Sequence, residues 1–283
     1  MKTSRKLSII VAALHVAAAA NLASFDFSSG TDAGLGGAIL LSRPSASTLV
    51  SLPAGLFPEG MLTLEIGASR KYALKELDRA FVAAGYRYRL WTMAIGISQL
   101  GRGDLYVERT LKAGLARQVN SFAVGGTVSA LFVSFGENYS RLDAATFGGT
   151  VSYAVSRVAA AVVADNLSSP RLSPSSPAFN PKYSLYVEAQ GERWFSLAGR
   201  MTLEEDERPQ FGLGQLVQLS EHGALSVGLS TAPMQYGAGL ELNAADVSVW
   251  YCTSYHPVLG FTHSAAFSLE IGRARRDNYN GEK

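Results

Sequence analysis

The stretch FTHSAAFSLEI, residues 261–271, alternates between two kinds of side chain along its whole length, and this pattern decides the fold. One parity is mostly apolar and the other is small or polar: the first carries Phe261, Ala265, Phe267, Leu269 and Ile271, and the second carries Thr262, Ser264, Ala266, Ser268 and Glu270. Such alternation is typical of a β-strand whose two faces meet different surroundings. One face of this strand therefore favours an apolar medium, and the other favours a polar one.

The same alternation recurs from about residue 60 to the end of this stretch. About fourteen segments of roughly ten residues show it, the length expected of a tilted strand that crosses a bilayer. We predict that these segments start near residues 61, 80, 91, 105, 121, 145, 157, 182, 194, 209, 223, 234, 245 and 261. An even number of antiparallel strands can close without leaving an unpaired edge in lipid. The sequence therefore predicts an all-β, transmembrane antiparallel β-barrel of about 14 strands.

The connections between these segments differ in length in a regular way. After even-numbered strands they are tight, for example at residues 156–157 and 244–245. After odd-numbered strands they tend to be longer, above all in DNLSSPRLSPSSPAFNP, residues 165–181. Short turns on one side and longer loops on the other are the topology of an outer-membrane barrel. We therefore expect the protein to lie in a bacterial outer membrane, with outer-membrane lipid around it.

A soluble β-sandwich or β-propeller is the alternative, because alternation also fits a sheet with one wet face. The composition argues against it: 47% of the residues are hydrophobic and only 17% are charged, against about 25% charged in typical soluble domains. Arg109 and Arg117 interrupt the pattern, since they share parity with apolar neighbours. We expect both near the ends of a long strand or beside a bulge, because a lipid-facing arginine is costly at mid-bilayer.

The first residues, MKTSRKLSIIVAALHVAAAANLA, have the features of a secretory signal peptide. A basic start is followed by an apolar run and then by small residues suited to cleavage, so residues 1–23 are predicted to be removed. The remaining chain has 22 basic and 23 acidic residues, a formal charge of −1. No basic stripe suggests a nucleic-acid partner. No later apolar run of about 18 residues predicts a membrane-spanning helix.

The residues able to carry chemistry do not form a recognisable site. Cys252 and His256 face the same way on an alternating strand, but they lie about 13 Å apart, too far to share one metal ion. His263 and Ser264 are adjacent, so they face opposite sides and cannot act as base and nucleophile. The run Glu204 to Arg208 is interpreted as a solvated loop. We therefore predict no catalytic residue, no metal site and no cofactor, and not an enzyme.

The stretch DAGLGGAILLSRPSASTLVSLPAGL, residues 32–56, resembles the N-terminal segment of FadL-like barrels of the PorV/PorQ type. In that group a "GMGGA" run is followed by "DASA" and then by "NPAGL". Gly36 and Gly37 match the first run, residues 45–47 match the second, and Pro53 and Gly55 match the third. This chain departs from the pattern at Leu52, which replaces the usual Asn.

The stretch YHPVLGFTHSAAFSLEIG, residues 255–272, resembles the closing hairpin of the same group, where a "hP-LG-sH--SL" pattern recurs. His256, Pro257, Gly260 and His263 would then be structural landmarks of that hairpin rather than catalysts. The chain continues beyond it with RARRDNYNGEK, residues 273–283, where many outer-membrane barrels end in an aromatic residue. We interpret these residues as a periplasmic tail.

The resemblance implies an N-terminal plug, residues 24–58, folded into the lumen of a barrel formed by residues 59–272. It also implies two competing functions. A PorV/PorQ-type protein would act in type IX-like secretion or surface attachment and would receive a secreted cargo protein. A FadL-like transporter would instead carry a hydrophobic small molecule in an apolar pocket against the plug, lined by Leu40, Leu41, Leu49 and Leu56. A structural barrel without transport is the third alternative.

Overall fold

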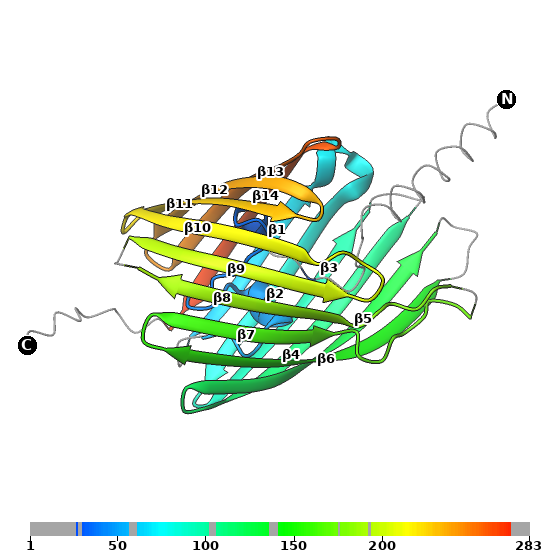
Figure 1. The fold of residues 1–283 in the computed structure, drawn as a ribbon, viewed down its shortest axis with the longest axis horizontal. Coiled ribbons are helices and arrows are strands. Elements are labelled where there is room, and N and C mark those ends of the chain that lie inside the picture. Colours follow the sequence, from blue (N-terminus) through cyan, green and yellow to red (C-terminus); the bar gives the residue numbers. More distant parts are fainter. Residues whose placement is uncertain are drawn as a thin grey trace, which may run out of the picture.

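The structure is a computed structural model that describes residues 27, 30–56, 61–101, 106–135, 141–174, 176–191 and 194–272. The predicted signal peptide, residues 1–23, and the predicted tail, residues 273–283, lie outside the described residues. The described residues form one closed, entirely antiparallel barrel (Figure 1). Each strand pairs with its neighbours in the sequence, and the first strand pairs with the last.

The barrel has fourteen strands, as predicted. They are β1 (Leu62–Arg70), β2 (Asp78–Tyr88), β3 (Trp91–Leu100), β4 (Val107–Val119), β5 (Phe122–Ser134), β6 (Leu142–Val155), β7 (Val158–Asp165), β8 (Lys182–Gln190), β9 (Phe195–Glu204), β10 (Gln210–Ser220), β11 (Gly223–Thr231), β12 (Met234–Ala244), β13 (Val247–His256) and β14 (Gly260–Ile271). Every predicted start lies within three residues of the observed one. Period-2 alternation located the strands because it is a local property of each segment.

The two parities of each strand face opposite sides of the wall. In β14, Phe261 and Phe267 are exposed on the outside, whereas Thr262, Ser264 and Ser268 are buried inside. In β3, Ile95 and Ile97 are likewise among the large apolar side chains that the barrel exposes. A belt of outward apolar side chains around a smaller, polar interior is what a membrane-spanning barrel presents to lipid and to its lumen.

The two ends of the barrel differ in their connections. At the short-turn end, the residues between β2 and β3, β4 and β5, β6 and β7, and β12 and β13 form tight turns, in which Arg89, Asn120, Ser156 and Ala245 have positive φ. At the opposite, long-loop end, β1 and β2 are joined through the short 3-10 helices η1 (Lys71–Ala73) and η2 (Lys75–Leu77). The longest connection, residues 166–181, is also at this end. The predicted asymmetry is confirmed.

The two arginines that interrupt the alternation lie toward the ends of β4 and point outward, as expected. The Arg117 guanidinium lies 5.5 Å from the centre of the Trp91 ring on β3. The Arg109 Nε donates a hydrogen bond of 3.0 Å to Gln99 Oε1. Each charge therefore has a polar or aromatic partner near an end of the barrel, where a lipid-facing arginine costs little.

Placing an arginine at mid-barrel is expected to destabilise the protein. Val128 lies in the middle of β5 and is 62% exposed on the outside. In Val128→Arg, the charge must enter the hydrocarbon, so we expect the free energy of unfolding to fall by about 2–4 kcal/mol. Val119→Arg, at the end of β4, is the matched control and should cost at most about 1 kcal/mol. Urea unfolding from liposomes measures both, and equal losses would contradict a lipid belt at the height of Val128.

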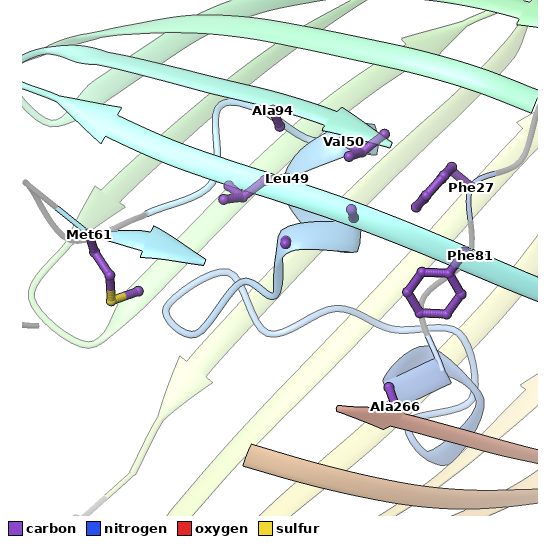
Figure 2. Packing of buried hydrophobic residues seen from close by; sticks show 9 residues of the cluster. Phe27, Leu49, Val50, Met61, Phe81, Ala94 and Ala266 are labelled. Carbon is purple, nitrogen blue, oxygen red and sulfur yellow. The ribbon is translucent and has the colours of Figure 1, made fainter. Parts of the chain in front are cut away.

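The N-terminal segment, residues 30–56, lies inside the barrel (Figure 1). Its short helix α2 (Gly30–Gly34) contacts β1 and β11 to β14, and helix α3 (Ala46–Ser51) contacts β1 to β4. No helix in the described part of the chain is long and apolar enough to cross a membrane. Figure 2 shows α3 packed beside the wall, where Leu49 and Val50 are buried with Phe27, Phe81 and Ala94.

Glycines on the inner face of the wall let this segment approach the strands closely. A Cβ atom added to Gly237 of β12 would lie 2.1 Å from the Ala33 carbonyl oxygen. A Cβ atom on Gly228 of β11 would lie 2.2 Å from the Leu35 carbonyl carbon. Only glycine fits at such separations, because the atoms it meets belong to the backbone and cannot move aside by changing a rotamer.

Candidate functional site

Two buried carboxylates hold the N-terminal segment at opposite walls of the barrel. Glu65 of β1 accepts hydrogen bonds from Ser47, 2.8 Å from the amide nitrogen and 2.7 Å from the hydroxyl. Glu188 of β8 accepts from the amide nitrogen and the hydroxyl of Ser42, at 2.8 and 2.5 Å. β1 and β8 are seven strands apart in a ring of fourteen. Each glutamate accepts two hydrogen bonds from the segment, so together they tie it to opposite sides of the lumen.

The local sequence of the segment explains its path. Gly36 and Gly37 have φ values of +65° and +78°, a region that glycine adopts without strain, and they turn the chain directly after α2. Ser45 caps α3 by accepting a hydrogen bond from the Thr48 amide at 3.2 Å. After α3, Pro53 packs against Gly114 of β4, and the Gly55 amide donates to the Leu52 carbonyl at 3.0 Å.

A cavity of about 280 Å³ lies between this segment and the wall, toward the long-loop end. Apolar side chains line part of it, including Phe27, Ile39, Leu52, Phe81 and Val163. Among the described residues, six charged side chains also line it: Asp32, Lys71, Lys112, Asp165, Lys182 and Arg200. Tyr72 of η1 and Tyr186 of β8 also border the cavity. The cavity can therefore hold a small molecule that has both an apolar and a polar part.

The charges around the cavity do not cancel. Lys112 of β4 pairs with Asp165 of β7, with 2.9 Å between Nζ and Oδ1, and the Lys112 side chain is only 3% exposed. Asp32 is the other acidic residue of the lining, against three further basic ones. Burial raises the pKa of the Tyr72 phenol above its ordinary value, so this side chain is neutral at pH 7 and adds no negative charge. The lining therefore has two more positive than negative charges.

The four leucines predicted to line a ligand pocket pack the N-terminal segment against the wall of the barrel. Leu49 is buried against β2 and β3 (Figure 2). Leu40 packs with Leu35 and Leu216, and Leu41 packs with Val163, the cluster that Leu56 also borders. None of the four lines the cavity, although Leu52 does. A contact between these leucines and a ligand stays a prediction.

The histidines of the last hairpin have local roles. His256 Nδ1 accepts hydrogen bonds from the amides of Val258 and Leu259, at 3.1 and 3.0 Å, across the turn that contains Pro257 and precedes Gly260. His263 lies on the outside of β14, where its Nδ1 is 2.8 Å from the Tyr251 hydroxyl. Cys252 points inward and is 1% exposed. The described residues contain no group of three His, Cys, Asp or Glu side chains able to hold a metal ion.

The residues that shape the cavity were not among those predicted from the sequence. Lys112 and Arg200 line the cavity and Glu188 holds the N-terminal segment beside it, and all three are charged residues on the inward parity of their strands. That parity was a usable signal, because a charge facing the lumen of a barrel requires a partner or a ligand. Which partner each one meets depends on the position of the N-terminal segment, and strand alternation carries no information about that.

The fold was compared with known proteins. No protein-family profile matches the sequence, and the search of curated proteins gave no match. Among solved structures, the monoaromatic hydrocarbon channel CymD matches with a TM-score of 0.60 at 12% identity, over 85% of this chain and 96% of that one. The chain shares the fold of these channels. The toluene transporter TodX of Pseudomonas putida matches with a TM-score of 0.55 at 10% identity, over 87% of this chain and 97% of that one.

A third structure widens the comparison. Omp33, an outer-membrane protein of Acinetobacter baumannii, matches with a TM-score of 0.50 at 7% identity, over 74% of this chain and 98% of that one. At such identities the likeness concerns the fold. CymD and TodX are described as a channel and a transporter, which agrees with the FadL-like part of the predicted resemblance. The PorV/PorQ type and a secreted cargo protein have no support among these structures.

Proposed function

We propose that this protein is a FadL-like channel that carries small molecules with an apolar part across a bacterial outer membrane. The observation that carries the proposal is the cavity between the N-terminal segment and the wall, inside a closed barrel of fourteen strands. The fold shared with CymD and TodX supports it. The apolar part of the lining, which includes the edge-to-face pair Phe27 and Phe81 with ring centres 5.8 Å apart, suits an aromatic or aliphatic body.

In this proposal the N-terminal segment acts as the plug. It contacts strands on both sides of the lumen and is held at Glu65 and Glu188. A molecule that enters the cavity from the long-loop end meets the segment before it can reach the short-turn end. Passage then requires the segment to shift, and the cost of that shift includes the lost hydrogen bonds and the apolar packing that the segment gives up at the wall.

Whole-cell uptake tests the proposed transport. Porin-deficient Gram-negative cells that produce the protein should take up radiolabelled toluene several-fold faster than cells with empty vector, because the outer leaflet resists hydrophobic molecules. The outer-membrane fraction, run on a gel with and without boiling, confirms that a folded barrel is present when the unboiled band migrates faster. Equal uptake in both strains, with the folded barrel present, would leave the structural barrel without transport as the better description.

A further inference from the structure

We propose that the cavity selects small organic anions with a compact apolar body, and that the guanidinium of Arg200 binds their anionic group. The inference rests on the proposed transport function and names the class of molecule carried. It depends on three features of the described residues. These are the missing partner of the Arg200 guanidinium, the glycine at position 37 that makes room for it, and the charge and shape of the lining around it.

Arg200 points into the lumen from the middle of β9 and lines the cavity. In the sheet it is flanked by Tyr186 of β8 and Gly212 of β10. Its Nε atom is buried and has no hydrogen-bond partner among the described residues. The Nε atom itself is covered by protein, whereas the terminal nitrogens of the guanidinium are not among the buried unpaired atoms. An incoming carboxylate or sulfonate would therefore bond to these terminal nitrogens and supply the countercharge that the guanidinium lacks.

Glycine at position 37 allows the guanidinium to lie where it does. A Cβ atom on Gly37 would lie 2.7 Å from the Arg200 Cζ atom, so the guanidinium occupies the space that a side chain would take. At Gly212 of β10, an added Cβ atom would instead meet the Gly36 carbonyl oxygen at 2.5 Å, so this glycine makes room for the turn after α2. The glycine run after α2 therefore both turns the chain and shapes the pocket around this charge. The position of the Arg200 guanidinium is therefore fixed by its close packing against the backbone of Gly37.

The electrostatics and the shape of the lining favour the same class of ligand. The described lining residues have an excess of two positive charges around a partly open cavity, which concentrates anions. Beside Arg200, the apolar side chains of Ile39 and Val163 pack together with the Tyr186 ring. A volume of about 280 Å³ is at the lower end of the range for ligand pockets, which favours a compact body over a long chain.

Matched aromatic probes test the inference in the uptake assay described above. Benzoate carries the anionic group at pH 7, and benzyl alcohol is the neutral molecule of similar shape. Arg200→Gln is expected to lower benzoate uptake about tenfold, the factor for one lost charge-assisted hydrogen bond, and to leave benzyl alcohol uptake unchanged. Arg200→Lys keeps the positive charge but loses the planar guanidinium, which can donate two parallel hydrogen bonds to one carboxylate. Its benzoate uptake should therefore lie between those of the wild type and Arg200→Gln.

Arg43→Gln is the matched control. Arg43 is an exposed arginine that does not line the cavity, and its guanidinium donates a hydrogen bond of 2.8 Å to Gln218 Oε1. This control should leave uptake of both probes unchanged, and the gel shift confirms that each variant is folded. Equal loss of both probes in Arg200→Gln, or uptake of benzyl alcohol without benzoate in the wild type, overturns the inference and leaves the transport proposal standing. Uptake of neither probe overturns both.

Discussion

Cells that produce oxidised Gly34→Cys protein are expected to take up no more substrate than cells without the channel. Full uptake should return when reductant is added. The reason is that a Cβ atom at position 34 lies 3.0 Å from the sulfur of Cys252, which points inward from β13. This is close to the separation spanned by the Cβ–S and S–S bonds of a disulfide. The new bond would tie α2 to the wall and prevent the segment from leaving the lumen.

The natural sequence contains a single cysteine, so the cross-link has only one partner. The hydroxyl of Ser226 lies 2.7 Å from the added Cβ atom, and it can rotate away because it is the end of a side chain. Two controls accompany the variant: oxidised wild type, and Gly34→Cys combined with Cys252→Ser, which cannot form the bond. Both should transport normally. Normal uptake by fully cross-linked protein would show that substrate passes without movement of α2.

Gly228→Val is expected to drive the N-terminal segment out of its position while the barrel stays closed. The added Cβ atom would lie 2.2 Å from the Leu35 carbonyl carbon and 2.4 Å from the Gly36 nitrogen, so neither α2 nor the turn after it can remain in place. Cys252 reports the movement, because it is 1% exposed and α2 covers it. We expect its reaction with a maleimide to become at least about tenfold faster, since the covered thiol otherwise reacts only through local opening. Ion conductance should rise as well.

Gly149→Val is the matched control for this substitution. Gly149 lies on β6, and a Cβ atom added there meets nothing within 4 Å. The same change of side chain should therefore leave both the thiol reaction and the conductance at wild-type values. If Gly228→Val also leaves Cys252 unreactive in a folded barrel, the segment accommodates the extra atoms. The close packing between β11 and residues 35–36 would then not be what positions the segment.

The strands and their order could be predicted from the sequence because each depends on local information. Alternation assigns one parity to lipid and one to the lumen, and the lengths of the connections distinguish the two ends. The positions of Arg109 and Arg117 followed from the cost of a charge in lipid. The resemblance implied an N-terminal plug, residues 24–58, and its role as a plug stays a prediction, while residues 30–56 contact strands on both sides of the barrel.

The contents of the lumen could not be predicted in the same way. The transport function implied a ligand pocket lined by the leucines at 40, 41, 49 and 56, and this contact stays a prediction; in the structure these residues pack the segment against the wall. The partners of Glu65 and Glu188 are serines 18 and 146 residues away in the chain. These contacts depend on where the N-terminal segment lies inside the barrel. The alternation of side chains along a strand does not predict that position.

By itself, therefore, the sequence determined a barrel of fourteen strands, which residues face lipid and at which end the long loops lie. All of these follow from rules that act within one strand or one turn. Only the tertiary structure decided that Gly37 makes room for the Arg200 guanidinium, that Gly34 meets Cys252, and that a positively charged cavity remains beside the segment. The physical reason is that closing the barrel brings residues from distant strands around one enclosed space, where packing and charge depend on all of them together.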